Sequence, residues 1–313
     1  MQAVGTRSLL EGALLAALVA LLGLVSCATG LTWLAAVPIM LAYGRNGGRN
    51  ALMVTAVGSF LLLLWGGPFA GLSTFGFGLA LGVVPGWAVR RGAGAAGAVL
   101  LMAGAFVVVT VIGAVGYVLI WHQNVWAQTW TSMKAFIVSH GAILTALHLS
   151  AQQATALLRD LLPLVVGGAA LGQAVAVYVI ADAVLRRLHS PLPAVPEFAR
   201  WRAPQWLLAI YLGALAVYFI ARAPAEQVVR AVALNLLLGL GVLYGIVGLA
   251  AAYGWLRHRG TPRSRSVALL ILGAAVLEAV GMAALVSIFG MLASQVDLAS
   301  VFADPAGNGR QEP

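Results

Sequence analysis

Long stretches without a charged residue constrain the fold of this chain more than any other feature of its sequence. No Asp, Glu, Lys or Arg occurs between residues 12 and 44, or between residues 92 and 133. Hydrophobic residues make up 62% of the 313 residues, and charged residues only 9%. A water-soluble protein of this length could not bury so much apolar surface. The sequence therefore predicts an all-α, polytopic bundle of membrane helices.

The hydrophobic runs set the number of helices, because a helix needs about 20 apolar residues to cross the hydrocarbon core of a bilayer. Spans are expected near residues 8–27, 50–65, 71–88, 97–120, 161–185, 205–222, 229–253 and 267–292. A further run, residues 31–43, is short and contains Pro38. This run is either a kinked short span or a re-entrant segment, and we favour a span. We therefore predict 8–9 transmembrane helices.

The distribution of basic residues predicts the orientation, because cytoplasmic loops of membrane proteins are rich in Lys and Arg. With all of these spans and a cytoplasmic N-terminus, most basic residues fall on the cytoplasmic side: Arg7, Arg45, Arg49, Arg90, Arg91, Arg186, Arg187, Arg200, Arg202, Arg257, Arg259, Arg263 and Arg265. We expect a multi-pass protein of a cell (plasma) membrane, such as a bacterial inner membrane. The net charge of +9 then reflects orientation and attraction to anionic lipids. Nucleic acid is not an expected partner, because the basic residues are divided among short loops.

Proline residues divide the chain. Residues 188–204 contain Pro191, Pro193, Pro196 and Pro204, and each proline disfavours helix at the residue before it. We predict a six-helix domain at residues 1–187, an extended cytoplasmic linker at 188–204, a three-helix region at 205–293 and a flexible tail at 294–313. At the end of the first domain, Asp182 and Arg186 have the i,i+4 spacing of a helical ion pair.

Small residues follow a helical spacing on the first predicted helix. Gly12, Ala16 and Ala20 form one row, and Ala13 and Ala17 form a second row beside it. Small residues let membrane helices approach closely. The rows therefore predict a contact face, which either packs against a neighbouring helix of the same chain or docks on another membrane protein.

A few polar and aromatic residues are candidates for function. Glu278 falls within the last predicted span, where a charged group costs about 2.5 kcal/mol or more; it is either functional or a protonated group bonded to another helix. Gln173 and Asn235 are expected to form interhelical hydrogen bonds. Trp121, Trp126 and Trp130 follow a predicted membrane exit and form either an aromatic belt at the lipid headgroups or part of a ligand site.

The sequence contains no pattern typical of an enzyme. G-x-S-x-G, H-E-x-x-H and G-x-x-x-x-G-K-[ST] are all absent. His122, His140 and His148 are not spaced three or four residues apart, so they indicate no metal site. We predict neither catalysis nor a cofactor nor a metal ion, and any active transport would take its energy from a partner or an ion gradient.

Three segments carry a resemblance to a known family. They are PIMLAYGRNGGRNA at residues 38–51, RLHSPLPAVPEFARWRAPQW at residues 187–206 with Pro196, Phe198, Trp201, Arg202 and Pro204, and NLLLGLGVLYGIVGLAAAYGWLRHR at residues 235–259. They resemble the YybS-like family of predicted membrane proteins, a domain of unknown function. That family is in turn distantly similar to the substrate-binding S components of energy-coupling-factor vitamin transporters.

The resemblance implies a fold and a role. The first six helices would be S-component-like, and the small residues Gly12, Ala13, Ala16, Ala17 and Ala20 would dock on a membrane-embedded T component that works with ATPase subunits. A small-molecule ligand would bind near the outer segment, with Trp121, Trp126, Trp130, Gln173, Asn235 and Glu278 as candidate contacts. The alternative is a non-catalytic membrane scaffold that holds cell-envelope or division partners through its linker.

Overall fold

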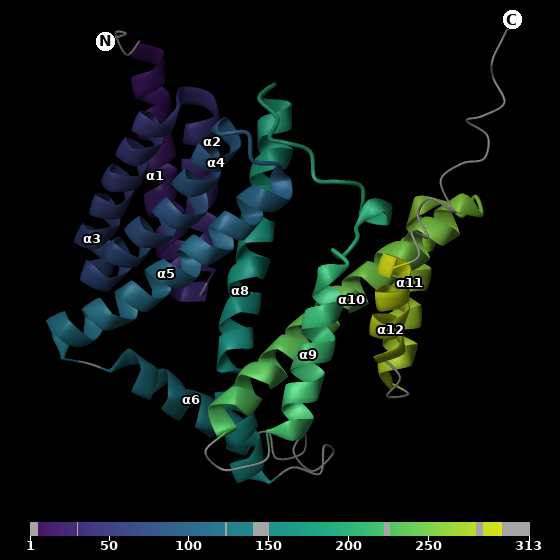
Figure 1. Cartoon of the computed structure of the whole chain (residues 1–313). Coiled ribbons are helices and arrows are strands. Elements are labelled where there is room, and N and C mark those ends of the chain that lie inside the picture. The colour runs from purple at the N-terminus through teal and green to yellow at the C-terminus, as the bar shows by residue number, and fades with distance from the viewer. Residues whose placement is uncertain are drawn as a thin grey trace, which may run out of the picture. The chain divides into compact units, whose positions relative to one another are not determined.

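The computed structural model describes residues 6–29, 31–122, 124–139, 150–221, 226–279 and 284–295. Helices make up nearly all of these residues, and the described ranges contain no strand (Figure 1). The predicted all-α fold is therefore confirmed. The chain forms two compact units: unit 1 comprises Met1–Thr155 and Val165–Val195, and unit 2 comprises Ala156–Leu164 and Pro196–Pro313. The change of unit at residue 195 falls within the predicted linker.

Unit 1 contains most of the N-terminal helices. Its elements are α1 (Thr6–Thr29), the 3-10 helix η1 (Thr32–Ala35), α2 (Ala36–Asn46), α3 (Gly48–Gly78), the π-helix η2 (Leu79–Val83), α4 (Val84–Arg90), α5 (Ala95–Trp121), α6 (Val125–Ser139) and the larger part of α8 (Ala151–Arg187). Unit 2 contains residues 156–164 of α8, the 3-10 helix η3 (Phe198–Arg200), α9 (Trp206–Ile220), α10 (Gln227–His258), α11 (Arg263–Ala279) and α12 (Ala284–Gln295).

Five described helical stretches are long and apolar enough to cross a membrane: Ser8–Ser26, Gly48–Arg90, Ala95–Ile120, Ala151–Arg187 and Gln227–His258. The helices α9 and α12 are shorter and also apolar. Of the span expected at residues 267–292, the structure describes α11 up to Ala279 and α12 from Ala284.

A sharp break folds the longest stretch into a hairpin. Gly67 lies within α3 and has φ 85° and ψ 172°, a conformation that favours glycine, and Pro68 follows it. A Cβ atom added to Gly71 would lie 2.5 Å from the Cβ atom of Leu63. The segment after Gly67 therefore packs back along the segment before it. This hairpin explains how the stretch Gly48–Arg90 holds the two spans expected at 50–65 and 71–88.

The short apolar run at residues 31–43 forms η1 and the first part of α2. Helix α2 has only 11 residues, and Ala36 to Tyr43 are all buried. It nevertheless returns the chain to the end of unit 1 where α1 begins, because Arg45 at its end forms an ion pair with Glu11 of α1 at 2.6 Å. This run therefore reverses the chain as a span does, although α2 is much shorter than a full transmembrane helix.

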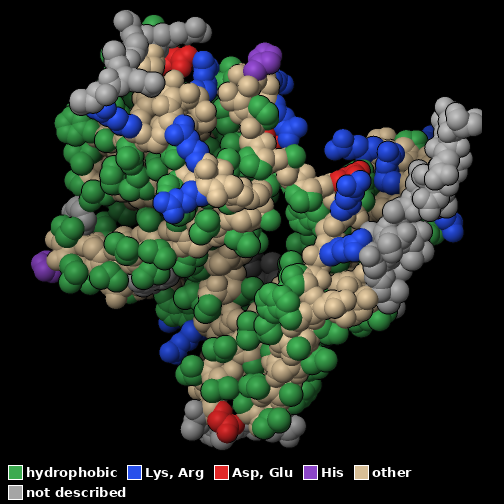
Figure 2. Space-filling view, turned by 45° about the horizontal axis from the view of Figure 1, so that its top comes forward, with side chains coloured by type: hydrophobic (Ala, Val, Ile, Leu, Met, Phe, Trp, Pro, Cys, Tyr) green, Lys and Arg blue, Asp and Glu red, His purple; other side chains and the backbone are tan. Residues whose placement is uncertain are grey.

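Basic residues of unit 1 gather at that same end. The Arg90 guanidinium lies over the Tyr43 ring, 5.1 Å from its centroid, and the ends of α4 and α2 therefore meet. Figure 2 shows blue Lys and Arg side chains at the end of unit 1 near the start of α1, with hydrophobic side chains covering the surface beyond them. The ends of α2 and α4 and the start of α1 therefore share one end of unit 1.

Candidate functional site

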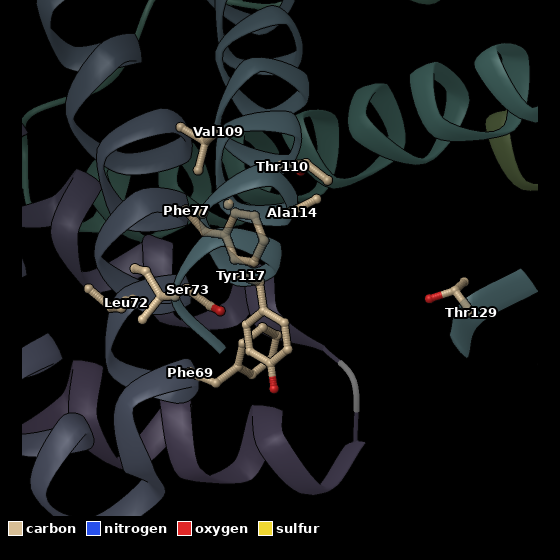
Figure 3. A pocket seen from close by; sticks show the side chains of 12 residues that line it. Phe69, Leu72, Ser73, Phe77, Val109, Thr110, Ala114, Tyr117 and Thr129 are labelled. Atoms are coloured by element: carbon tan, nitrogen blue, oxygen red, sulfur yellow. The ribbon is translucent and has the colours of Figure 1, made fainter. Parts of the chain in front are cut away.

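A cavity of about 400 Å³ opens between the part of α3 that follows Gly67, the C-terminal half of α5, and α6 (Figure 3). All of these elements belong to unit 1. The residues that line the cavity are Phe69, Leu72, Ser73, Phe77, Val109, Thr110, Gly113, Ala114, Gly116, Tyr117, Ile120 and Thr129. Its volume is at the lower end of the range typical of small-molecule sites, about 300–1,000 Å³.

Aromatic pairs hold the walls of this cavity. Phe69 of α3 meets Tyr117 of α5 edge to face, with ring centroids 5.2 Å apart. Phe77 of α3 stacks on Phe106 of α5 at 4.7 Å. Because stacked and edge-to-face ring pairs are favourable, these two contacts join α3 and α5 beside the cavity.

Two glycines leave part of the α5 side of the cavity bare. A Cβ atom added to Gly113 or Gly116 would have no neighbour within 4 Å. The open space therefore lies directly against the α5 backbone, and no side chain of the described residues fills it. The arrangement offers a ligand the rings of Phe69 and Phe77 on the α3 side and a bare stretch of helix at Gly113 and Gly116 on the α5 side.

Of the candidate contacts predicted from the sequence, those with described side chains, Trp130, Gln173 and Asn235, do not line this cavity. Trp130 lies on α6, with the Lys134 ammonium 5.7 Å from its ring centroid. Trp121 ends α5 and Trp126 lies near the start of α6, but their side chains fall outside the described part of the structure, as does the side chain of Glu278 in α11.

Sequence reasoning missed the aromatic and hydroxyl residues that line the cavity. Phe69, Ser73 and Phe77 are spaced four residues apart on α3, and Thr110, Gly113 and Tyr117 lie close together on one face of α5. This helical spacing of hydroxyls, glycines and aromatics was the available signal. In an apolar run it is easily mistaken for ordinary helix packing.

Asn235 forms the interhelical hydrogen bonds expected of it, within unit 2. Its Oδ1 accepts from the backbone N–H of Leu164 at 3.0 Å, and its amide donates to the backbone carbonyl of Asp160. These two groups are the usual i,i−4 partners in a helix, and they flank Pro163, which has no N–H. Asn235 therefore bridges the helix at its proline. Gln173 is half-buried, and its Oε1 has no hydrogen-bond partner in the described structure.

The two rows of small residues on α1 face different surroundings. Gly12, Ala16 and Ala20 are buried, and a Cβ atom added to Gly58 of α3 would lie 3.0 Å from the Ala16 carbonyl. This row packs against α3 of the same chain. Ala13 and Ala17 are exposed, so only the second row is available to another membrane protein.

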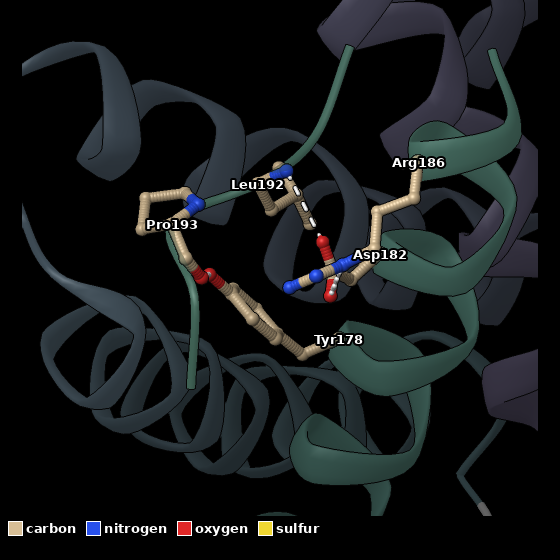
Figure 4. A network of polar contacts seen from close by, with 5 residues as sticks. All are labelled: Tyr178, Asp182, Arg186, Leu192 and Pro193. Carbon is tan, nitrogen blue, oxygen red and sulfur yellow. Dashed lines mark hydrogen bonds and ion pairs between the residues drawn. The ribbon is translucent and has the colours of Figure 1, made fainter. Parts of the chain in front are cut away.

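A polar cluster fastens the start of the linker to α8 (Figure 4). Asp182 accepts from Arg186 Nε at 2.7 Å and from the Leu192 backbone N–H at 3.2 Å. Tyr178, which is fully buried, donates from its hydroxyl to the Pro193 carbonyl at 2.7 Å. The predicted i,i+4 pair of Asp182 and Arg186 is confirmed, and the same carboxylate also holds the linker backbone. No helix occurs at residues 190–197.

No group of three or more His, Cys, Asp or Glu residues within the described ranges is placed to hold a metal ion. His122 ends α5 as its C-cap, whereas His140 and His148 fall outside those ranges.

Comparison with known proteins assigns the chain to a family. A family model described as a predicted membrane protein (DUF2232) matches residues 13–292. No curated protein and no solved structure matches the chain.

Proposed function

We propose that this chain, which belongs to the DUF2232 family of predicted membrane proteins, is a ligand-binding subunit of a membrane transport system. The observation that carries this proposal is the cavity between α3, α5 and α6. It lies inside a membrane-embedded unit, is framed by aromatic rings and is open along the glycine edge of α5. A site of this kind suits reversible binding of a small molecule.

The chain needs a source of energy if it moves its ligand. Its sequence contains no nucleotide-binding P-loop, so the proposed partners are a membrane-embedded T component and its ATPase subunits. The exposed row of Ala13 and Ala17 on α1 supports such a partnership, because small residues let a second helix approach the backbone closely. The transport role by itself assigns no enzymatic activity to the chain.

Substituting both Ala13→Leu and Ala17→Leu should leave the protein folded and inserted but reduce co-purification of the partner at least tenfold. Both residues are exposed, so the added side chains disturb no described contact within the unit. The matched control is Ala16→Leu, at a position only 3% exposed, which should lower thermal stability because it overpacks the α1–α3 contact. Undiminished recovery of the partner with the double variant would show that the exposed row does not dock.

The runner-up function is a non-catalytic scaffold for cell-envelope or division proteins. The linker favours it, because Trp201 is held in place by a bond from its Nε1 to the Pro196 carbonyl at 2.9 Å and is still 38% exposed. Exposed aromatic residues are frequent in protein interfaces. A cavity that binds nothing, together with recovery of envelope proteins through the linker, would favour the scaffold over the transport subunit.

A further inference from the structure

The chemistry of the cavity lining restricts what it can bind. None of the described residues that line it carries a charge. A charged ligand would lose its hydration on entering such a cavity without gaining an ionic partner, which is strongly unfavourable. The lining therefore selects against anionic and cationic ligands.

Hydroxyl groups supply the polar contacts of the cavity. They belong to Ser73 on α3, to Thr110 and Tyr117 on α5 and to Thr129 on α6. The Thr110 hydroxyl donates its proton to the Phe106 carbonyl at 2.8 Å, so its remaining lone pairs can only accept. A ligand that meets Thr110 must therefore present a donor such as a hydroxyl or an N–H group.

The rim of the cavity is apolar and exposed. Phe69 is 57% exposed, Leu72 is 52% exposed and Ile120 is 63% exposed. All three belong to stretches that are long and apolar enough to cross a membrane. Exposed apolar side chains of membrane-spanning stretches face lipid, so this rim favours entry of a ligand from the membrane over entry from water.

We infer that the cavity binds an uncharged, membrane-soluble amphiphile, with an apolar chain or ring between the aromatic wall of α3 and the glycine edge of α5, and with one hydroxyl or N–H donor near Thr110. This inference rests on the proposed function, because it names the ligand class of the same cavity. It is narrower than that function, since a transport subunit could equally carry a charged ligand.

A pair of probes with the same apolar body tests the inference. Full-length protein in phosphatidylcholine nanodiscs is titrated with radiolabelled farnesol and with farnesyl phosphate. We expect farnesol to bind saturably and at least tenfold more tightly than the phosphate. Substituting both Gly113→Leu and Gly116→Leu places side chains into the open space and should weaken farnesol binding at least tenfold.

The matched control is Gly104→Leu, on the same helix, where an added Cβ atom also has no neighbour within 4 Å but which does not line the cavity. This variant should bind farnesol as the unchanged protein does. Equal or tighter binding of the phosphate would overturn the inference and leave the proposed function standing, because the cavity would still hold a ligand. Failure of both probes to bind saturably would also overturn the inference, whereas the proposed function depends on whether the native protein carries any small molecule.

Discussion

Gly290→Ala should destabilise the protein by about 3 kcal/mol and detach α12 from α10. An added Cβ atom would lie 1.8 Å from the Tyr244 carbonyl oxygen and 2.7 Å from the Gly248 backbone nitrogen. Backbone atoms cannot rotate aside as a flexible side chain can, so the helices must move apart. Glycine at both sides of the crossing allows this close approach, as in other membrane helix pairs.

The destabilisation by Gly290→Ala would be measured as a fall in the free energy of unfolding in detergent, with thermal unfolding as a second readout. Gly241→Ala is the matched control, because it lies on α10 and its added Cβ atom meets nothing within 4 Å. Alanine is the better helix former, so this control should be neutral or slightly stabilising. Equal stability of both variants would contradict the described α10–α12 contact.

The Asp182→Ala substitution should cost about 2 kcal/mol and release the start of the linker from α8. The carboxylate accepts from the Leu192 N–H and from Arg186 Nε. Leu192 is only 9% exposed, so its N–H would lose its partner at a site where water has little access. The Arg186 side chain is 53% exposed, and the lost ion pair therefore contributes less than the lost backbone contact.

Hydrogen exchange at the Leu192 amide measures this effect most directly. Exchange should be faster in Asp182→Ala than in the unchanged protein. The Asp182→Asn variant keeps an oxygen that can accept from the Leu192 N–H, so it should retain most of the protection while it loses the charge that faces Arg186. Similar exchange rates in all three proteins would show that the carboxylate does not hold the linker.

The helices of this protein can be predicted from its sequence because backbone groups inside a membrane need hydrogen-bond partners within the protein. Within the hydrocarbon core each N–H and C=O group must be paired inside the protein, so a long apolar run predicts a helix directly. The predicted separation of residues 50–65 from 71–88 also follows from local chemistry, since Gly67 adopts a positive φ and Pro68 restarts the helix. Likewise, the spacing of Asp182 and Arg186 was sufficient to predict their ion pair.

Contacts between distant segments could not be predicted in the same way. The two rows of small residues on α1 are an example, because helical spacing alone does not tell whether Ala16 or Ala17 faces the neighbouring helix. Only the packing of Gly58 against the Ala16 carbonyl decides it. The cavity depends on how α3 folds back and where it meets α5, so Phe77 and Tyr117 had no sequence signal beyond their helical spacing.

The central claim is that the cavity between α3, α5 and α6 holds a small molecule. The most direct measurement is mass spectrometry of small molecules bound to the protein after purification from native membranes in mild detergent. We predict one compound in near-stoichiometric amount with the unchanged protein and with Gly104→Leu, and its loss from the variant carrying both Gly113→Leu and Gly116→Leu. If the unchanged protein carries no small molecule and co-purifies with envelope or division proteins instead, the ligand-binding function is wrong and the scaffold takes its place.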